Sequence, residues 1–249
     1  MMNYKFLHIL IIIAVFSNIC NTQESSVPRI IDLSDSTYSD FTKINGTKFP
    51  GHLGYGLACG DINGDGYDDI IMIEDYYSQY TENFYPYGTA RILFGSDSIR
   101  QREEFSAVTG ETMTIYLKYM GPSKGIPGTF KPYCKDLDGD GYDDIVIDNF
   151  GIVFGTPNFS NNDSINYLYD DDKILYLTDD NLLEVADIDR DGMADLIVGN
   201  MEYSSPVDNT KGIVKIIFGD PLLRQKQDLY NNLSGLRVKW IFTGDVSGR

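Results

Sequence analysis

The stretch ACGDINGDGYDDIIMI, residues 58–73, decides the fold of this chain because it recurs twice further along. The second copy is YCKDLDGDGYDDIVID at residues 133–148, and the third is VADIDRDGMADLIVG at residues 185–199. Internal repetition of this kind is typical of proteins built from stacked, similar units. In each copy, a loop rich in Asp and Gly leads into a run of Ile, Leu and Val, which indicates a β-strand.

Each copy is followed by a second apolar run that ends in Phe-Gly. These runs are ARILFG at 90–95, GIVFG at 151–155 and IVKIIFG at 213–219. Residues 182–186 and 236–242 add further strand-like segments, and no window keeps a convincing helical period. A small sheet cannot bury its faces alone. The repeat therefore predicts an all-β protein whose sheets stack around an axis, as in a β-propeller, or in a line, as in a solenoid.

The loop pattern is Asp-x-[Asp/Asn]-x-Asp-Gly-x-x-Asp. Side-chain oxygens stand at positions 1, 3, 5 and 9, position 7 would offer a backbone carbonyl, and Gly at position 6 permits a sharp turn. Hard oxygen donors in this number favour Ca²⁺ over zinc, so we expect up to three calcium sites. The expected ligands are Asp61, Asn63, Asp65, Tyr67 and Asp69; Asp136, Asp138, Asp140, Tyr142 and Asp144; and Asp187, Asp189, Asp191, Met193 and Asp195. Asp68 and Asp143, at position 8, are expected to be dispensable for binding.

Other calcium loops of similar appearance do not fit. An EF-hand requires a bidentate Glu at position 12 and flanking helices, but position 12 is Met72, Ile147 and Val198 here. The same residues exclude a dockerin, which also needs an acid there. The tandem nonapeptides of a calcium-binding parallel β-helix are absent from the sequence.

The stretch LGYGLACGDINGDGYDDI, residues 53–70, resembles the FG-GAP repeats of integrin α-chain propellers and related extracellular proteins. The resemblance covers roughly residues 45 to 249, with Leu53-Gly54 in place of Phe-Gly and Gly199-Asn200-Met201 in place of Gly-Ala-Pro. It implies FG-GAP-type blades whose calcium loops join the first and second strands on one face of a disc, with ligands bound on the opposite face. The family ring has seven blades, so three repeats imply an incomplete ring of about three to four blades.

The N-terminus predicts a signal peptide over residues 1–22, with Lys5, an apolar run at 6–16 and a polar end. An uncleaved signal anchor is the alternative, and no other stretch could span a membrane. Residues 23–249 are predicted to form the partial propeller, with repeats at approximately 45–122, 123–178 and 179–249. Because Phe242-Thr243-Gly244 falls where Phe49-Pro50-Gly51 falls, we expect a fourth repeat beyond Arg249. A ring completed by self-association is the competing interpretation.

Composition agrees with a secreted or cell-surface protein. The formal net charge of −17 argues against nucleic-acid binding, which requires a basic patch. Sequons for N-glycosylation begin at Asn45, Asn158, Asn162 and Asn232. Cys59 and Cys134 occupy the same position in two repeats, and we expect them to be free thiols buried on inner strands.

These observations predict a calcium-binding module for adhesion or recognition, with an extracellular protein or carbohydrate as ligand. The tyrosine-rich segment 75–88, which includes Tyr76, Tyr77 and Tyr80, is a candidate recognition loop or a set of rings packed over the sheet edge. No enzyme is predicted, because the only histidines are His8 and His52 and no nucleophile–base pair is evident. The alternatives are the non-catalytic propeller region of an extracellular enzyme, similar to glycosylphosphatidylinositol-specific phospholipase D, and a purely structural surface protein.

Overall fold

The computed structural model describes residues 43–46, 51–76, 87–99, 104–106, 111–118, 130–177, 181–204, 211–226, 228–229 and 232–242, all of them in the unit Thr42–Arg249. Their secondary structure consists of β-strands and short 3₁₀ turns, including η2 (Asp171–Lys173) and η3 (Pro221–Gln225), with no α-helix among the described residues. The all-β prediction is therefore confirmed. The predicted signal peptide and most of the tyrosine-rich segment 75–88 lie outside the described residues.

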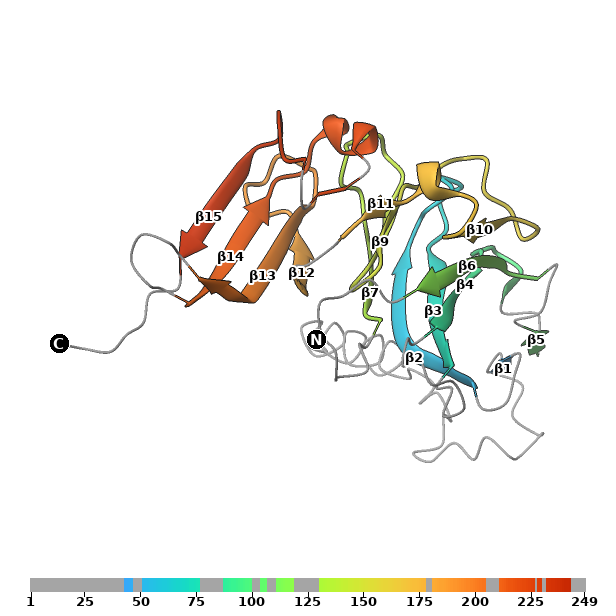
Figure 1. Cartoon of the computed structure of the whole chain (residues 1–249). Coiled ribbons are helices and arrows are strands. Elements are labelled where there is room, and N and C mark those ends of the chain that lie inside the picture. The colour runs from blue at the N-terminus through green and yellow to red at the C-terminus, as the bar shows by residue number, and fades with distance from the viewer. Residues whose placement is uncertain are drawn as a thin grey trace, which may run out of the picture. The chain divides into compact units, whose positions relative to one another are not determined.

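The first sheet has the strand order β10-β6-β4-β3-β2 (Figure 1). Its strands are β2 (Gly51–Gly60), β3 (Asp69–Tyr76), β4 (Tyr87–Leu93), β6 (Met113–Lys118) and β10 (Ser164–Asn166). Neighbours are antiparallel except for β10, which comes from the second predicted repeat and pairs with β6 in parallel. A separate parallel pair joins β1 (Lys43–Asn45) to β5 (Glu104–Ser106).

The second and third sheets are four-stranded antiparallel meanders (Figure 1). The second contains β7 (Pro132–Lys135), β8 (Asp144–Ile147), β9 (Gly151–Val153) and β11 (Leu175–Tyr176). The third contains β12 (Asn181–Ala186), β13 (Asp195–Ser204), β14 (Lys211–Ile217) and β15 (Val238–Phe242). Such four-stranded units agree with a few propeller blades, and the described sheets do not close into a ring.

The second sheet is buried on both faces. Successive side chains of a strand point to opposite faces of its sheet, and here each face packs against a different neighbouring sheet. Ile145 and Ile147 of β8 join an apolar core that includes Ile71 and Ile92 of the first sheet. Val146, between them, joins a second core with side chains of the third sheet. All four residues of β8 are buried. The short apolar runs in the sequence are thus strands packed between neighbouring sheets.

The residue at loop position 2 is buried only where another sheet follows in the stack. Ile62 and Leu137 are fully buried, whereas Ile188 is 45% exposed. Ile62 O accepts a hydrogen bond from Thr156 N at 2.9 Å, and Leu137 O accepts one from Asp220 N at 3.0 Å. Each of the first two loops is therefore covered by the residue that follows Phe-Gly in the next sheet.

The two described cysteines are free, as predicted, but they differ in burial. Cys134 is buried between the first and second sheets, close to Gly60. Cys59 is exposed, so the prediction that it lies on a buried inner strand is wrong. The reason is its place in the stack: the repeats share a pattern, but Cys134 is covered by a preceding sheet and Cys59 is not.

Three of the predicted glycosylation sites are exposed and therefore accessible: Asn158, Asn162 and Asn232. Their glycosylation remains a prediction. Within the described part of the chain, no helix has the length and apolar character needed to cross a bilayer.

We predict that Leu137→Ala destabilises the fold and that the matched change Ile188→Ala does not. Leu137 fills a sealed interface, so its truncation should lower the free energy of unfolding by about 2–5 kcal/mol. Ile188 has the same loop position but is exposed, so its truncation should cost only about 0.5 kcal/mol. Urea denaturation of both variants tests this. Equal losses would show that the two positions are packed alike.

Candidate metal centres

The three acidic loops join the first and second strands of their sheets and share one backbone course. Positions 4 and 6 have positive φ in every loop: 73° and 88° at Gly64 and Gly66, 75° and 88° at Gly139 and Gly141, and 63° and 95° at Arg190 and Gly192. Glycine adopts this region without steric penalty, which explains its recurrence. Arg190 adopts it as well, so the third loop keeps the same turn despite its different residue.

The aspartate at position 1 organises each loop from inside. Asp136 accepts hydrogen bonds from Gly139 N at 2.7 Å and from Gly141 N at 3.0 Å, one on each carboxylate oxygen. Asp61 and Asp187 accept the corresponding bonds from positions 4 and 6 of their own loops. The loops are thus wrapped around a carboxylate. Asp61 Oδ1 accepts a second bond from Asp65 N, but the other oxygen of each carboxylate keeps a lone pair for a cation.

The aspartate at position 9 is fully buried in all three repeats. Asp144 accepts hydrogen bonds from Leu137 N at 2.9 Å and from Gly155 N at 2.9 Å. The same two bonds hold Asp69 to Ile62 and Gly95, and Asp195 to Ile188 and Gly219. This carboxylate therefore connects the acidic loop to the Phe-Gly end of the third strand.

Burial also changes the acidity of these groups. Desolvation raises the pKa of Asp69 to about 6, although the two backbone hydrogen bonds oppose it. The same cause raises the pKa of Asp144 to about 7. At neutral pH a cation beside either carboxylate would offset the cost of its buried charge.

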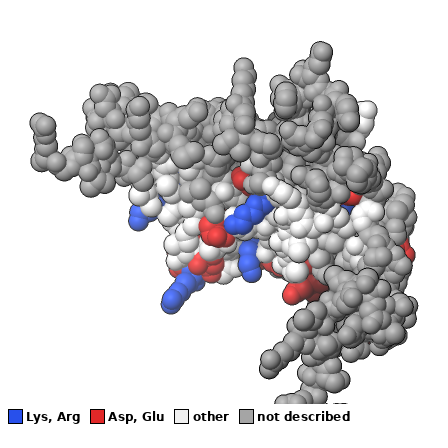
Figure 2. All heavy atoms as spheres, turned by 90° about the horizontal axis from the view of Figure 1, so that it is seen from below, with Lys and Arg blue, Asp and Glu red and all other residues white. Residues whose placement is uncertain are grey.

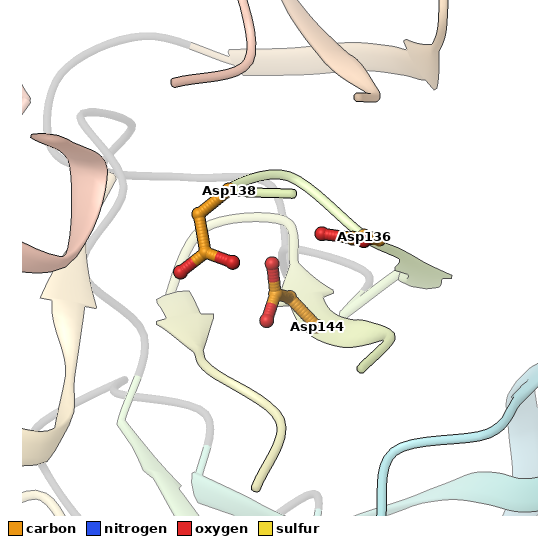
Figure 3. A group of neighbouring side chains, drawn as sticks. All are labelled: Asp136, Asp138 and Asp144. Atoms are coloured by element: carbon orange, nitrogen blue, oxygen red, sulfur yellow. The ribbon is translucent and has the colours of Figure 1, made fainter. Parts of the chain in front are cut away.

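Two loops gather three carboxylates into a cluster that could hold a metal ion. In the second loop these are Asp136, Asp138 and Asp144, whose contributing oxygens lie within 4.8 Å of one another. Figure 3 shows the carboxylates of Asp138 and Asp144 turned toward each other, with that of Asp136 alongside. The third loop gathers Asp187, Asp189 and Asp195 in the same way. Oxygen-only donors of this kind fit a hard divalent cation.

Several of the remaining predicted ligands bind other protein groups instead of joining a carboxylate cluster. In the first loop, position 3 is Asn63, whose amide nitrogen donates to Asp65 at 3.1 Å. Asp140 and Asp191, at position 5, lie outside the carboxylate clusters and bind arginines instead. The roles predicted for the carbonyls of Tyr67, Tyr142 and Met193 remain predictions.

Neighbouring loops are bonded to each other. Asp143 N donates to Asp61 O at 3.0 Å, and the Asp143 carboxylate accepts from Asp61 N at 3.1 Å. Ala194 N donates to Asp136 O at 2.7 Å in the same way, but Ala194 has no carboxylate for the second bond. Position 8 of one loop thus supports position 1 of the loop before it, a role that the sequence did not reveal.

Two arginines were also missed by the sequence analysis. Arg224, on η3, pairs with Asp138 and Asp140 of the second loop. Arg237, just before β15, pairs with Asp189 and Asp191 of the third loop at 2.9 and 2.6 Å. A comparison of the residues that follow Phe-Gly, FGTPNFS at 154–160 and FGDPLLR at 218–224, would have singled out Arg224.

We predict that the metal-free chain is more stable at pH 5 than at pH 7.5. Asp69 and Asp144 have folded-state pKa values of about 6 and about 7, above the ordinary 3.8. The folded state therefore binds protons more tightly, and this stabilisation is lost as pH rises through 6 to 7. Melting temperatures measured in chelator test this. Asp144→Asn should flatten the dependence, and a wild-type stability that rises with pH would contradict it.

Comparison with known proteins supports one repeat directly. A search among curated proteins found no match for the chain. Residues 53–90 match the FG-GAP repeat, whose general setting is the integrin α-like propeller. The matched residues run from β2 through the first acidic loop and β3 into β4. The first sheet of this chain, with its acidic loop, therefore contains an FG-GAP repeat.

Proposed function

We propose that this protein is an extracellular, calcium-binding FG-GAP repeat protein that acts as a recognition or adhesion module for a protein or carbohydrate ligand. The proposal rests mainly on the structural similarity of the three acidic loops. All three share the same turn, the same organising carboxylate and the same buried Asp at position 9, and the first lies inside the matched FG-GAP repeat.

Calcium is the cation that best suits these loops. Each offers several carboxylate oxygens and backbone carbonyl oxygens, and the first adds the amide oxygen of Asn63. Ca²⁺ accepts six to eight oxygen ligands of these kinds. Mg²⁺ requires a smaller octahedral site and dehydrates reluctantly. The ion would sit against carboxylates that tie each loop to its sheet, so its main effect would be to stiffen the scaffold.

The proposed ligand class rests on charge and on the fold. The net charge of −17 disfavours nucleic acid and anionic membrane surfaces. In the view of Figure 2, the described acidic and basic side chains lie among one another and among uncharged residues. Such a mixed surface suits a protein or carbohydrate better than a polyanion.

We predict that calcium raises the thermal stability of the full chain. With dissociation constants of about 10⁻⁴ to 10⁻³ M, about 2 mM calcium would add about 0.6–1.8 kcal/mol per site. Three sites should then raise the melting temperature by roughly 5–15 °C over the chelated protein. Magnesium at the same concentration is the control and should have a smaller effect. A melting temperature that chelator leaves unchanged would contradict the proposed calcium binding.

The recognition role is tested separately from calcium binding. The purified chain should bind defined extracellular-matrix proteins or glycans on an array in calcium and lose that binding in chelator. Asp61→Ala, which removes the organiser of the first loop, should weaken it as chelator does. Saturable calcium binding without any calcium-dependent ligand would leave a structural surface protein as the better description.

A further inference from the structure

Arg224 contacts the second acidic loop. Its guanidinium pairs with Asp138 through Nε and with Asp140 through Nη2, and it donates to Gly155 O at 3.0 Å. Nη2 also lies 3.9 Å from Asp144. The guanidinium carbon lies 5.0 Å from the centre of the Phe154 ring. Arg224 is thus held by the same Phe-Gly segment that Asp144 binds.

Arg237 makes the same arrangement at the third loop from a different place in the chain. It pairs with Asp189 and Asp191, at positions 3 and 5 of that loop, and its guanidinium lies 5.0 Å from the centre of the Phe218 ring. Phe154 and Phe218 are the equivalent residues of two Phe-Gly segments. Two unrelated positions in the chain therefore deliver an arginine to the same point of two loops.

The arginines bind the oxygens that a metal ion would use. Asp140 Oδ1 accepts from Tyr142 N at 3.0 Å, and the other oxygen, Oδ2, binds Arg224. Asp138 likewise gives Oδ1 to the backbone and Oδ2 to Arg224. In the third loop, Asp191 Oδ1 accepts from Met193 N at 3.0 Å and Oδ2 binds Arg237. A cation at positions 3 and 5 must therefore compete with a guanidinium for these oxygens.

Within the part of the chain that the structure describes, no arginine pairs with the first loop. Ser160 stands where Arg224 stands in the third repeat, three residues after the proline that follows Phe-Gly. If the pairing of β4 with β6 is continued, Glu111 falls opposite Phe94, as Arg237 falls opposite Phe218. Among the described residues, no basic side chain pairs with the first loop, where Asn63 donates to Asp65 instead.

The number of carboxylates also distinguishes the first loop from the other two. Positions 1, 3, 5 and 9 carry three carboxylates in the first loop, because position 3 is Asn63, and four in each of the others. The extra carboxylate, Asp138 or Asp189, is in each case bound by the arginine. Each arginine thus compensates for the additional Asp at position 3.

We propose that Arg224 and Arg237 are built-in competing cations, so that the second and third loops take up Ca²⁺ at higher concentrations than the first. This rests on the proposed calcium binding. The arginines hold the four-carboxylate loops together when calcium is scarce, and calcium must displace them to gain all its ligands. The chain would then respond to calcium in two steps, first at Asp61–Asp69 and later at the other two loops.

The test is calorimetric calcium titration of the full chain and of Arg224→Ser, which gives the second loop the residue found at Ser160. One site should tighten roughly tenfold, while the other two stay unchanged. Arg224→Lys, which keeps the charge but loses the planar fork, should bind calcium with an affinity between those of wild type and Arg224→Ser. Lys226→Ser removes a charge two residues away, where Lys226 Nζ contacts Ser234 O, and serves as the matched control.

Melting temperatures give a second readout that a merely structural role would not produce. Arg224→Ser should melt lower than wild type in chelator, yet gain more from calcium. Arg237→Ser, whose side chain is more exposed, should do the same for the third loop if Arg224→Ser fails to fold. Unchanged or weaker calcium binding in a folded variant overturns the inference while leaving calcium binding intact. No calcium binding in the wild type overturns both.

Discussion

The buried aspartate at position 9 is the constraint on which the rest of the structure depends. Asp69, Asp144 and Asp195 each close the same pair of hydrogen bonds, one from the acidic loop and one from the Phe-Gly segment. The motif at the start of a repeat and the motif at its end are therefore two halves of one contact. A charged carboxylate in an apolar sheet is costly, and the same desolvation raises the pKa of Asp144.

Other backbone contacts connect the candidate metal-binding loops to the stacking of the sheets. Asp143 and Ala194 bond their loops to the backbone of the loop before, and Thr156 and Asp220 cover position 2 of that loop. A loop that lost its shape would therefore loosen two sheets rather than one. This explains why an ion bound at the surface of such a protein could stabilise its whole stack.

The sequence predicted the structural features that all three repeats share, but it did not predict the features that differ between repeats. Three loops in one register predicted their strands, the turn at position 6 and the carboxylate clusters of the second and third loops, because these depend on residues close together in the chain. The exposure of Cys59 depends on which sheet has a neighbour, and a repeat pattern cannot show that. The parallel pairing of β10 with β6 and the ion pairs of Arg224 are contacts between distant segments, set by packing.

The difference between the loops follows from how each balances its own charge. Carboxylates crowded within nine residues repel one another, and the repulsion grows with the number that lack a partner. The first loop reduces it by replacing Asp with Asn63, which also supplies an N–H donor to Asp65. The second and third keep the Asp and add a guanidinium, whose planar fork spans two carboxylates and rests on an aromatic ring. The amide of Asn63 belongs to the loop itself, whereas the arginines come from η3 and from the residue before β15. The repeats therefore share one scaffold but differ in their counter-charges, and in the calcium binding that we propose this difference would set how readily each loop exchanges an internal partner for the ion.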